Sequence, residues 1–497
     1  RMISHLYTKE KGESRIFSAF CRMYIWKQPP YNKQSITNLR FTGGKTTMER
    51  SEMKDLTTGS PMRLILGFAV PMLLGLLFQQ FYNMVDTIVV GKFLGVSALA
   101  SVGSTGSINF MINGFCIGVC SGFAIPIAQR FGAGDYHGLR KFTANAGWLS
   151  AAFAVVMTAV VGVLCMDILR WMQTPEDIIQ GAYDYIFIIF LGIPVTYLYN
   201  MLSGIIRSLG DSRTPVYFLL LSSVMNIFLD VFTILVMGMG VDGPAYATVV
   251  SQGISGLLCL VYMIKHYPVL KMTEEEKKPD PNMMKILCSM GIPMGLQYSI
   301  TAIGSVVLQA AVNSLGSMAV AAVSAGNKVS MFFCCPFDAL GGTMATFAGQ
   351  NVGAGKLDRV REGVKMASII GIVYSVIAFA VLALGGKYIA LLFLDAGETE
   401  IIDQVSIFLI GNSMFYIPLV FVNVVRFAIQ GMGFSTFAIL GGVCEMAART
   451  FVRFFLVPIF GYLPICIASP LAWICADLFL IPAFYHCLKK LKKLMHQ

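Results

Sequence analysis

Asp86 ends a long apolar run, and its type and surroundings make it the first residue of this 497-residue sequence that could do chemistry. Asn83, Tyr82 and Gln79 precede it by three, four and seven positions, which places these side chains on one face of a helix. A carboxylate inside an apolar environment is costly and persists only with a partner or a task. The polar stripe therefore predicts a site for a proton or a small cation.

A second polar pair points to the same chemistry. Asn226 and Asp230 are four residues apart in another apolar run, so they also share a helix face. Carboxylate and amide oxygens are hard ligands that suit Na⁺, and a carboxylate also accepts a proton. We therefore expect Asp86, Asn226 and Asp230 to form either a proton site or a Na⁺ site.

The elements that must position these residues are membrane-spanning helices. Apolar residues make up 56% of the chain and charged residues only 13%, which excludes an ordinary soluble domain. A bilayer core requires roughly 20 apolar residues per helix. The sequence contains twelve such runs, which begin near Arg63, Ser97, Phe142, Ile178, Thr214, Pro244, Met283, Met318, Val364, Ile401, Phe437 and Pro464. We expect an all-α membrane protein with twelve transmembrane helices.

The twelve runs form two copies of one unit. The segment Gln129-Arg130-Phe131-Gly132-Ala133-Gly134 returns 221 positions later as Gln350-Asn351-Val352-Gly353-Ala354-Gly355. Six spans per copy is an even number, so both copies enter the membrane in the same direction and form parallel repeats around a central cleft. Each Gln-x-x-Gly-Ala-Gly segment predicts a tight cytoplasmic turn after the second span of its copy.

The carboxylates are not part of the repeated scaffold. At an offset of 219 positions, Asn226 and Asp230 correspond to Glu445 and Arg449, an acid and a base that can neutralise each other on one helix. Asp86 corresponds to Val307 or Leu308. This asymmetry places the predicted ion site in the first copy alone.

Loop charge predicts the orientation, because Lys and Arg accumulate in cytoplasmic loops. The basic loops all lie on the side of both termini, so we expect a protein of the cell (inner) membrane with both termini in the cytoplasm. The predicted organisation is a basic, disordered tail at 1–52 that comes from upstream translation, a first lobe at 53–264, a solvated cytoplasmic linker at 265–282, a second lobe at 283–488 and a basic tail at 489–497.

Other reactive residues give weaker signals. Eleven of the twelve cysteines lie in apolar spans, and no His lies close to the pairs Cys116/Cys120 or Cys334/Cys335 to complete a zinc set, so we expect buried thiols and no structural metal or other cofactor. Gly43-Gly44-Lys45-Thr46 lacks the first glycine of a phosphate-binding loop. We expect no ATP hydrolysis and no nucleic-acid partner.

The second copy holds some polar residues within its spans. Asp338 could bind a cation or be tied to a neighbouring helix, and the sequence does not separate these roles. Arg426 and Gln430 lie near the end of a span, where we expect either residues of the helix end or side chains that reach the membrane surface. Pro71 removes a backbone hydrogen bond from the first span and predicts a hinge there.

Taken together, the motifs resemble those of multidrug and toxic compound extrusion transporters of the prokaryotic type, over about residues 53–490. The matching pieces are Val85-Asp86-Thr87-Ile88-Val89-Val90-Gly91, the doubled Gln-x-x-Gly-Ala-Gly, Arg207-Ser208-Leu209-Gly210-Asp211-Ser212, Asn226-x-x-x-Asp230 and Gly240-Val241-Asp242-Gly243-Pro244-Ala245. The resemblance implies a monomeric antiporter that exports cationic amphiphilic compounds in exchange for H⁺ or Na⁺ by alternating access.

The resemblance also implies site residues. Within the ion site it adds Asn200 and Thr248 to Asp86, Asn226 and Asp230. Candidate cleft residues are Gln79, Tyr82, Asn83, Gln297 and Asp338. A second-lobe ion site found in another branch of the family needs an acid on the seventh helix, where this sequence has Gln297, Gln309 and Asn313 but no carboxylate.

Two other classes remain as alternatives. A flippase for lipid-linked cargo shares this architecture, although its cleft is often lined by several Arg. An intramembrane aspartyl protease is the enzyme alternative, because Tyr183-Asp184 and Leu209-Gly210-Asp211 partly match its motifs. Ser208 replaces a required glycine, and Asp211 lies in a basic loop. We therefore expect a transporter and not an enzyme.

Overall fold

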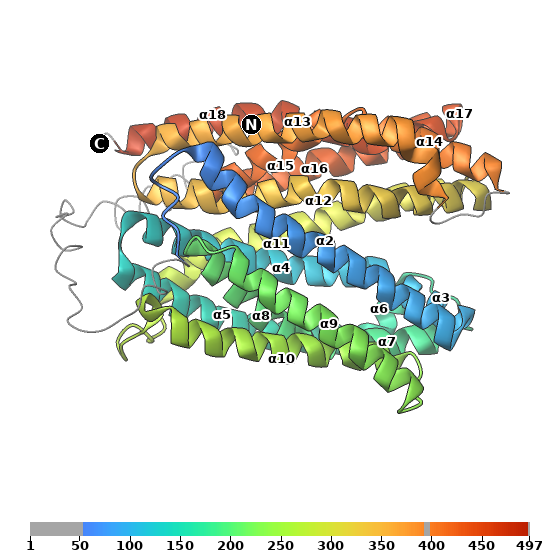
Figure 1. Cartoon of the computed structure of the whole chain (residues 1–497), viewed down its shortest axis with the longest axis horizontal. Helices are drawn as coiled ribbons and strands as arrows, with labels where there is room; N and C mark the ends of the chain where they lie inside the picture. Colours follow the sequence, from blue (N-terminus) through green and yellow to red (C-terminus); the bar gives the residue numbers. More distant parts are fainter. Residues whose placement is uncertain (1–52, 392–397, 496–497) are drawn as a thin grey trace, which may run out of the picture.

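The computed structural model of the chain describes residues 53–391 and 398–495, and this part is helical (Figure 1). The predicted basic tail at 1–52 lies outside the described residues. In the first half the helices are α2 Pro61–Leu94, α3 Val96–Ser104, α4 Gly106–Ala133, α5 Tyr136–Val163, α6 Cys165–Trp171, α7 Ile179–Leu191, α8 Ile193–Ser208, α9 Arg213–Leu235 and α10 Asp242–His266.

A short connection and a second set of helices complete the chain. They are η3 Pro268–Leu270, α11 Pro281–Asn313, α12 Ser317–Gly353, α13 Leu357–Ala390, α14 Thr399–Ser413, α15 Tyr416–Gly431, α16 Ser435–Phe451, the π-helical η4 Val452–Leu456, α17 Val457–Phe460 and α18 Leu463–Met495.

The helices account for the twelve predicted spans. Within the described ranges, nine helices are individually long and apolar enough to cross a membrane, and two bent pairs raise that number to eleven. The bent pairs are α7 with α8, at 45°, and α14 with α15, at 49°. The twelfth span consists of α16, η4 and α17, which follow one another without a gap. The predicted all-α membrane fold is confirmed.

The duplication is visible in local structure. The first helix of each half contains an internal proline, Pro71 in α2 and Pro293 in α11. The helices α4 and α12 both end in turns that contain a left-handed glycine, Gly134 at φ 70° and Gly355 at φ 73°. The tight turns predicted for the doubled motif are therefore confirmed, because glycine adopts this backbone conformation without steric cost.

The two halves lie side by side as two groups of helices, coloured blue to green and yellow to red in Figure 1. Between them, α11 packs along α4, and α2 packs against both α12 of the second lobe and α9 of the first. We call the end of the bundle at which α4, α8, α12, α15 and α18 finish the basic end; it lies at the left of Figure 1.

The predicted tail at 489–497 begins as helix. The last helix, α18, continues through this segment to Met495, because Leu488 and Leu491 are buried in the apolar core of the second lobe. Lys492 also forms an ion pair with Asp358 at the start of α13, at 2.7 Å. Amphipathic spacing therefore extends the helix beyond the apolar run.

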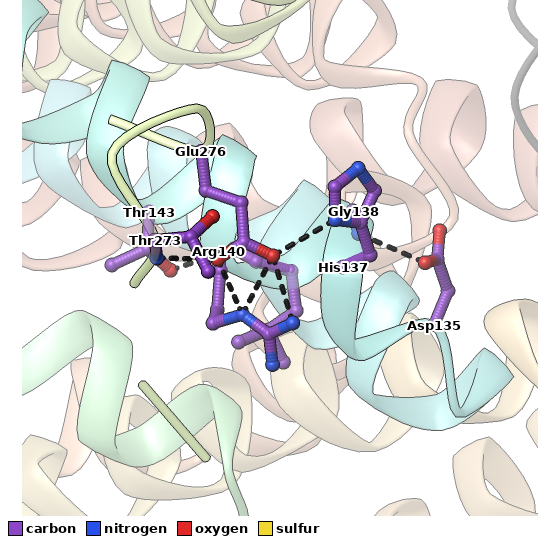
Figure 2. A network of polar contacts seen from close by, with 8 residues as sticks. Asp135, His137, Gly138, Arg140, Thr143, Thr273 and Glu276 are labelled. Carbon is purple, nitrogen blue, oxygen red and sulfur yellow. Dashed lines mark hydrogen bonds and ion pairs between the residues drawn. The ribbon is translucent and has the colours of Figure 1, made fainter. Parts of the chain in front are cut away.

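The predicted solvated linker is anchored by one buried acid (Figure 2). The two Glu276 carboxylate oxygens accept hydrogen bonds from Arg140 Nε at 2.8 and 2.9 Å, and Glu276 Oε1 lies 2.8 Å from His137 Nδ1. The Thr273 backbone N–H donates to Glu276 Oε2 at 2.9 Å. These donors, Arg140 first, lower the pKa of Glu276 to about 2. The linker is therefore tied to α5 and only partly solvated.

Candidate functional site

Asp86 and Asp230 come together between α2 and α9. The two helices pack against each other, and the two carboxyl groups face one another within hydrogen-bonding reach. Asp230 is fully buried and Asp86 is half-buried. The structure thus joins two acids that lie 144 positions apart in the sequence.

Four buried oxygen atoms at this position lack a donor among the described residues. They are Asp86 Oδ1, both Asp230 carboxylate oxygens and Asn226 Oδ1. Two ionised carboxylates repel each other and cannot hydrogen-bond directly, because neither carries a proton. A proton shared between them, or a small cation among the oxygens, would remove both difficulties. The donor set therefore suits either H⁺ or Na⁺.

Asn226 is held by the predicted hydroxyl. Its Nδ2 donates to Thr248 Oγ1 of α10 at 3.2 Å, and α9 packs along α10. Because the amide nitrogen is engaged in this bond, the carbonyl oxygen is the part of the buried Asn226 side chain that remains for a ligand. The structure thus brings four of the five predicted ion-site residues together.

Asn200, the fifth predicted residue, makes its hydrogen bond within its own helix. Its Nδ2 donates to the Thr196 carbonyl oxygen of α8 at 2.8 Å. The side chain is half-buried, and no described contact joins it to the two acids. Its role in the ion site stays a prediction.

Two tyrosines complete the surroundings of the acids. Tyr82 of α2 and Tyr185 of α7 both lie close enough to Asp86 and Asp230 to interact with them electrostatically. Tyr185 was not predicted, because it comes from a third helix with no fixed spacing from either acid. The available signal was a tyrosine within an otherwise apolar run, Tyr185-Ile186-Phe187-Ile188-Ile189-Phe190.

Gln79 and Asn83, the other residues of the polar stripe, precede Asp86 on α2. Gln79 is half-buried and Asn83 is exposed, so both are accessible from the surroundings of the helix. The proline predicted as a hinge, Pro71, lies inside α2 without ending it. Next to it, the Met72 sulfur accepts a hydrogen bond from Thr343 Oγ1 of α12 at 3.9 Å, so this part of α2 contacts the second lobe.

The second lobe contains a buried charged cluster that joins the predicted Glu445–Arg449 pair to Arg426, which the sequence did not place there. Arg426 of α15 forms an ion pair with Glu445 of α16, and Arg449 lies 3.7 Å from the same carboxylate. Gln430, one turn after Arg426, donates to Gln297 Oε1 of α11. Arg426 and Gln430 lie in the last two turns of α15, as expected of residues at a helix end. The expectation that they reach the membrane surface is wrong, because both side chains are buried between helices.

Two further acids lie near this cluster. Asp338 of α12 is exposed, and its electrostatic neighbours include Arg426 and Tyr298 of α11. Asp477 of α18 is buried beside Arg426 and Glu445, and its Oδ1 lacks a donor within the described ranges. Of these two acids, Asp338 is the one that a ligand can reach.

Asp211, one of the two acids considered for a protease, has a structural role. Its carboxylate accepts hydrogen bonds from the backbone N–H groups of Arg213 and Thr214 at the start of α9, at 2.8 and 3.2 Å. The Tyr267 hydroxyl donates to its other oxygen at 2.6 Å. In the described part of the chain, no three His, Cys, Asp or Glu side chains gather as a metal site.

Comparison with known proteins gives a consistent result. A family model described as MatE matches residues 71–232 and 293–455, once in each half. The chain is 30% identical over 341 residues to the "Probable multidrug resistance protein YoeA" of Bacillus subtilis, which covers 67% of this chain and 73% of that protein. It is 24% identical over 367 residues to a FAD transporter of Shewanella oneidensis, with 72% and 79% covered.

Solved structures share the fold. A crystal structure of MATE in complex with MaL6 has a TM-score of 0.82 at 22% identity, covering 88% of this chain and 99% of that chain. A MOP superfamily transporter from Pyrococcus furiosus has a TM-score of 0.81 at 22% identity, with 89% and 98% covered. The matched repeats and the curated relatives together show that the chain belongs to the MatE family of multidrug and toxic compound extrusion transporters, which are membrane transporters and not enzymes.

Proposed function

We propose that this protein is a secondary active antiporter that exports cationic amphiphilic compounds in exchange for H⁺ or Na⁺. The observation that carries the proposal is the Asp86–Asp230 pair, three of whose carboxylate oxygens are buried without a hydrogen-bond donor among the described residues. Such a pair gains a proton or a cation more readily than it stays doubly ionised. Ion binding at this pair therefore changes the charge between α2 and α9.

The position of α2 supports coupling between this site and the lobes. The helix packs against α9 in the first lobe and against α12 and α13 in the second. Neutralising Asp86 removes the repulsion between its carboxylate and that of Asp230, near the C-terminal end of α2. Met72, in the N-terminal half of the same helix, contacts α12. Pro71 lies between the N-terminus of α2 and the acid, where a missing backbone hydrogen bond allows bending. An ion that binds one arrangement of the lobes more tightly than the other thus shifts the equilibrium toward the first.

We infer that a cationic substrate uses the polar residues that remain accessible. Gln79, Tyr82 and Asn83 extend from the ion site along α2, and Asp338 is the exposed acid beside the charged cluster of the second lobe. A cation near Asp86 competes with H⁺ or Na⁺ for the same negative charge, which is the physical basis of exchange. Gln297 is engaged with Gln430 and is the weakest of these candidates.

We also propose that the basic end faces the cytoplasm of a cell membrane. The helix ends that flank the turns after α4, α8 and α12, together with the linker and the end of α18, carry most of the basic residues near the ends of the spans. Cytoplasmic loops are enriched in Lys and Arg. Efflux then runs from the basic end to the opposite end of the bundle.

The test is the neutral substitution of each acid. Asp86→Asn and Asp230→Asn should each reduce efflux of a cationic dye to the level of cells without the transporter, because neither amide can take up a proton or hold the pair's charge. Asp403→Asn is the matched control, since this exposed acid lies in the second lobe in an ion pair with Lys387. Membrane abundance should be equal in all variants. Full dye efflux by both Asp86→Asn and Asp230→Asn would refute the proposal.

Purified protein in vesicles identifies the coupling ion. Dye movement should follow an imposed H⁺ gradient, an imposed Na⁺ gradient, or both, and the Asp86→Asn variant should lose the response. Movement that is independent of both gradients would exclude antiport with either ion.

A further inference from the structure

The two copies of the Gln-x-x-Gly-Ala-Gly motif touch each other at the basic end. A Cβ atom added to Gly132 would lie 1.9 Å from the Gln350 carbonyl oxygen, and one added to Gly353 would lie 1.8 Å from the Gln129 carbonyl oxygen. Any residue other than glycine would therefore separate the two backbones. The end of α4 and the end of α12 are in direct main-chain contact across the lobe boundary.

The glutamine of each motif crosses to the opposite lobe. Gln129 Nε2 donates to the carbonyl oxygen of Gly431, the last residue of α15, at 3.0 Å. Gln350 Nε2 donates to the carbonyl oxygen of Ser208, the last residue of α8, at 2.9 Å. The helices α8 and α15 are equivalent in the duplication, so the two bonds form a symmetric pair. Both glutamine side chains are buried.

The segment before α2, residues 53–60, lies over the same contact. The Leu56 backbone N–H donates to Gln350 Oε1 at 2.9 Å, and the Leu56 side chain is buried. On the first lobe, the Lys54 carbonyl oxygen is 1.9 Å from where a Cβ of Gly210 would lie. This segment therefore contacts both lobes, and it can keep both contacts only while the lobes are close together at the basic end.

We propose that the two motif copies form a latch that holds the lobes together at the basic end, and that its opening is a required step of the transport cycle. Alternating access needs the lobes to separate at one end and then at the other. Separation at the basic end must break both glutamine bonds, part the glycine contact and release residues 53–60. The latch goes beyond ion and substrate binding, because none of its residues touches the Asp86 site.

The test uses variants that weaken the latch by different means. Gly132→Ala and Gly353→Ala force the backbones apart, whereas Gln129→Met and Gln350→Met remove the crossing hydrogen bonds while keeping side-chain length. Gly147→Ala is the matched control, because this helical glycine of α5 has open space where its Cβ would lie. If the glycine variants fail to fold, the glutamine variants decide the question.

The measurement is the distribution of distances between spin labels on the two lobes. One label pair spans the basic end at positions 136 and 362, and the other spans the opposite end at Trp171 and Tyr388, all exposed. Labels are attached through non-canonical amino acids, since the chain holds twelve cysteines. These distances do not depend on transport, so the result is separate from the test of the ion site.

The latch variants should increase the fraction of molecules open at the basic end. Gln129→Met loses one crossing hydrogen bond and should raise the open-to-closed ratio about fivefold, since such a bond contributes about 1 kcal/mol. Gln350→Met should raise the ratio more, because it also loses the hydrogen bond from the Leu56 N–H. The distance at the opposite end should shorten in the same molecules. Distributions like those of wild type, or widening at the basic end without shortening at the other, would overturn the proposal.

Discussion

At the scale of single residues, Glu445 holds together the charged cluster of the second lobe. It is the acid that pairs with both Arg426 and Arg449. Glu445→Gln should lower the free energy of unfolding by roughly 3–5 kcal/mol, because two buried guanidinium groups would lose the carboxylate with which they form ion pairs. The apparent melting temperature in detergent measures this effect.

The control for this prediction is Glu400→Gln, an exposed acid at the start of α14. Replacing Glu445, Arg426 and Arg449 together by Met should recover much of the loss, since well-packed apolar side chains of similar volume can replace a buried ion cluster. A Glu445→Gln protein with the same apparent melting temperature as wild type would contradict this account.

The sequence predicts the N-lobe acids better than it predicts this cluster. Asp86 and Asp230 stand out because a charged residue within a long apolar run is costly and is kept only where it has a partner or a function. The Glu445–Arg449 spacing is also readable, since i and i+4 share a helix face. Arg426 pairs with Glu445 from another helix, and nothing in the spacing of 19 residues indicates that contact. Tyr185 is missed for the same reason.

At the scale of elements, the linker between the lobes depends on Glu276. Above its unfolded pKa near 4.5 the ionised carboxylate stabilises the docked linker, and this stabilisation is lost as pH falls toward its folded pKa of about 2. The linker should therefore remain docked throughout the physiological range. Glu276→Gln should lower the free energy of unfolding by about 2 kcal/mol, the scale of hydrogen bonds to a charged group.

Limited proteolysis of the linker measures this prediction together with the melting temperature. Glu275→Gln is the control, because Glu275 is exposed and adjacent. Cleavage near Lys277 and Lys278 should be faster in the Glu276→Gln protein than in the control. Equal cleavage rates in both proteins would show that the Glu276 contacts do not hold the linker.

Helix positions follow from the apolar runs, but helix breaks do not. The bends between α7 and α8 and between α14 and α15 occur at equivalent places in the two halves, each within a single apolar run. The π-helical turn η4 likewise interrupts a run that looks uniform. A proline lies in the first turn after each break, at Pro194, Pro418 and Pro458, where it removes a backbone hydrogen bond that hydropathy does not describe. The buried anchor of the linker was also hidden, because a run of Glu and Lys is usually solvated.

At the scale of the whole molecule, the duplication predicts two lobes but not how they meet. Which end of the bundle is closed depends on contacts between residues more than 200 positions apart, such as Gln129 with Gly431. Alternating access requires that the state closed at one end and the state closed at the other differ little in free energy. The sequence therefore has to be compatible with both states. Only the structure shows the lobes joined at the basic end.

The parallel orientation of the two halves makes one further prediction about topology. Gly238 follows α9 and Gly461 follows α17, at equivalent places of the two copies, and both glycines have positive φ and open space around them. An epitope inserted after either residue should be labelled from outside intact cells, because both loops lie at the end opposite the basic end. An epitope inserted between Glu274 and Glu275 should be labelled only after permeabilisation. Labelling of Gly238 and Gly461 insertions on opposite sides would refute parallel repeats, and labelling of both only after permeabilisation would reverse the proposed direction of efflux.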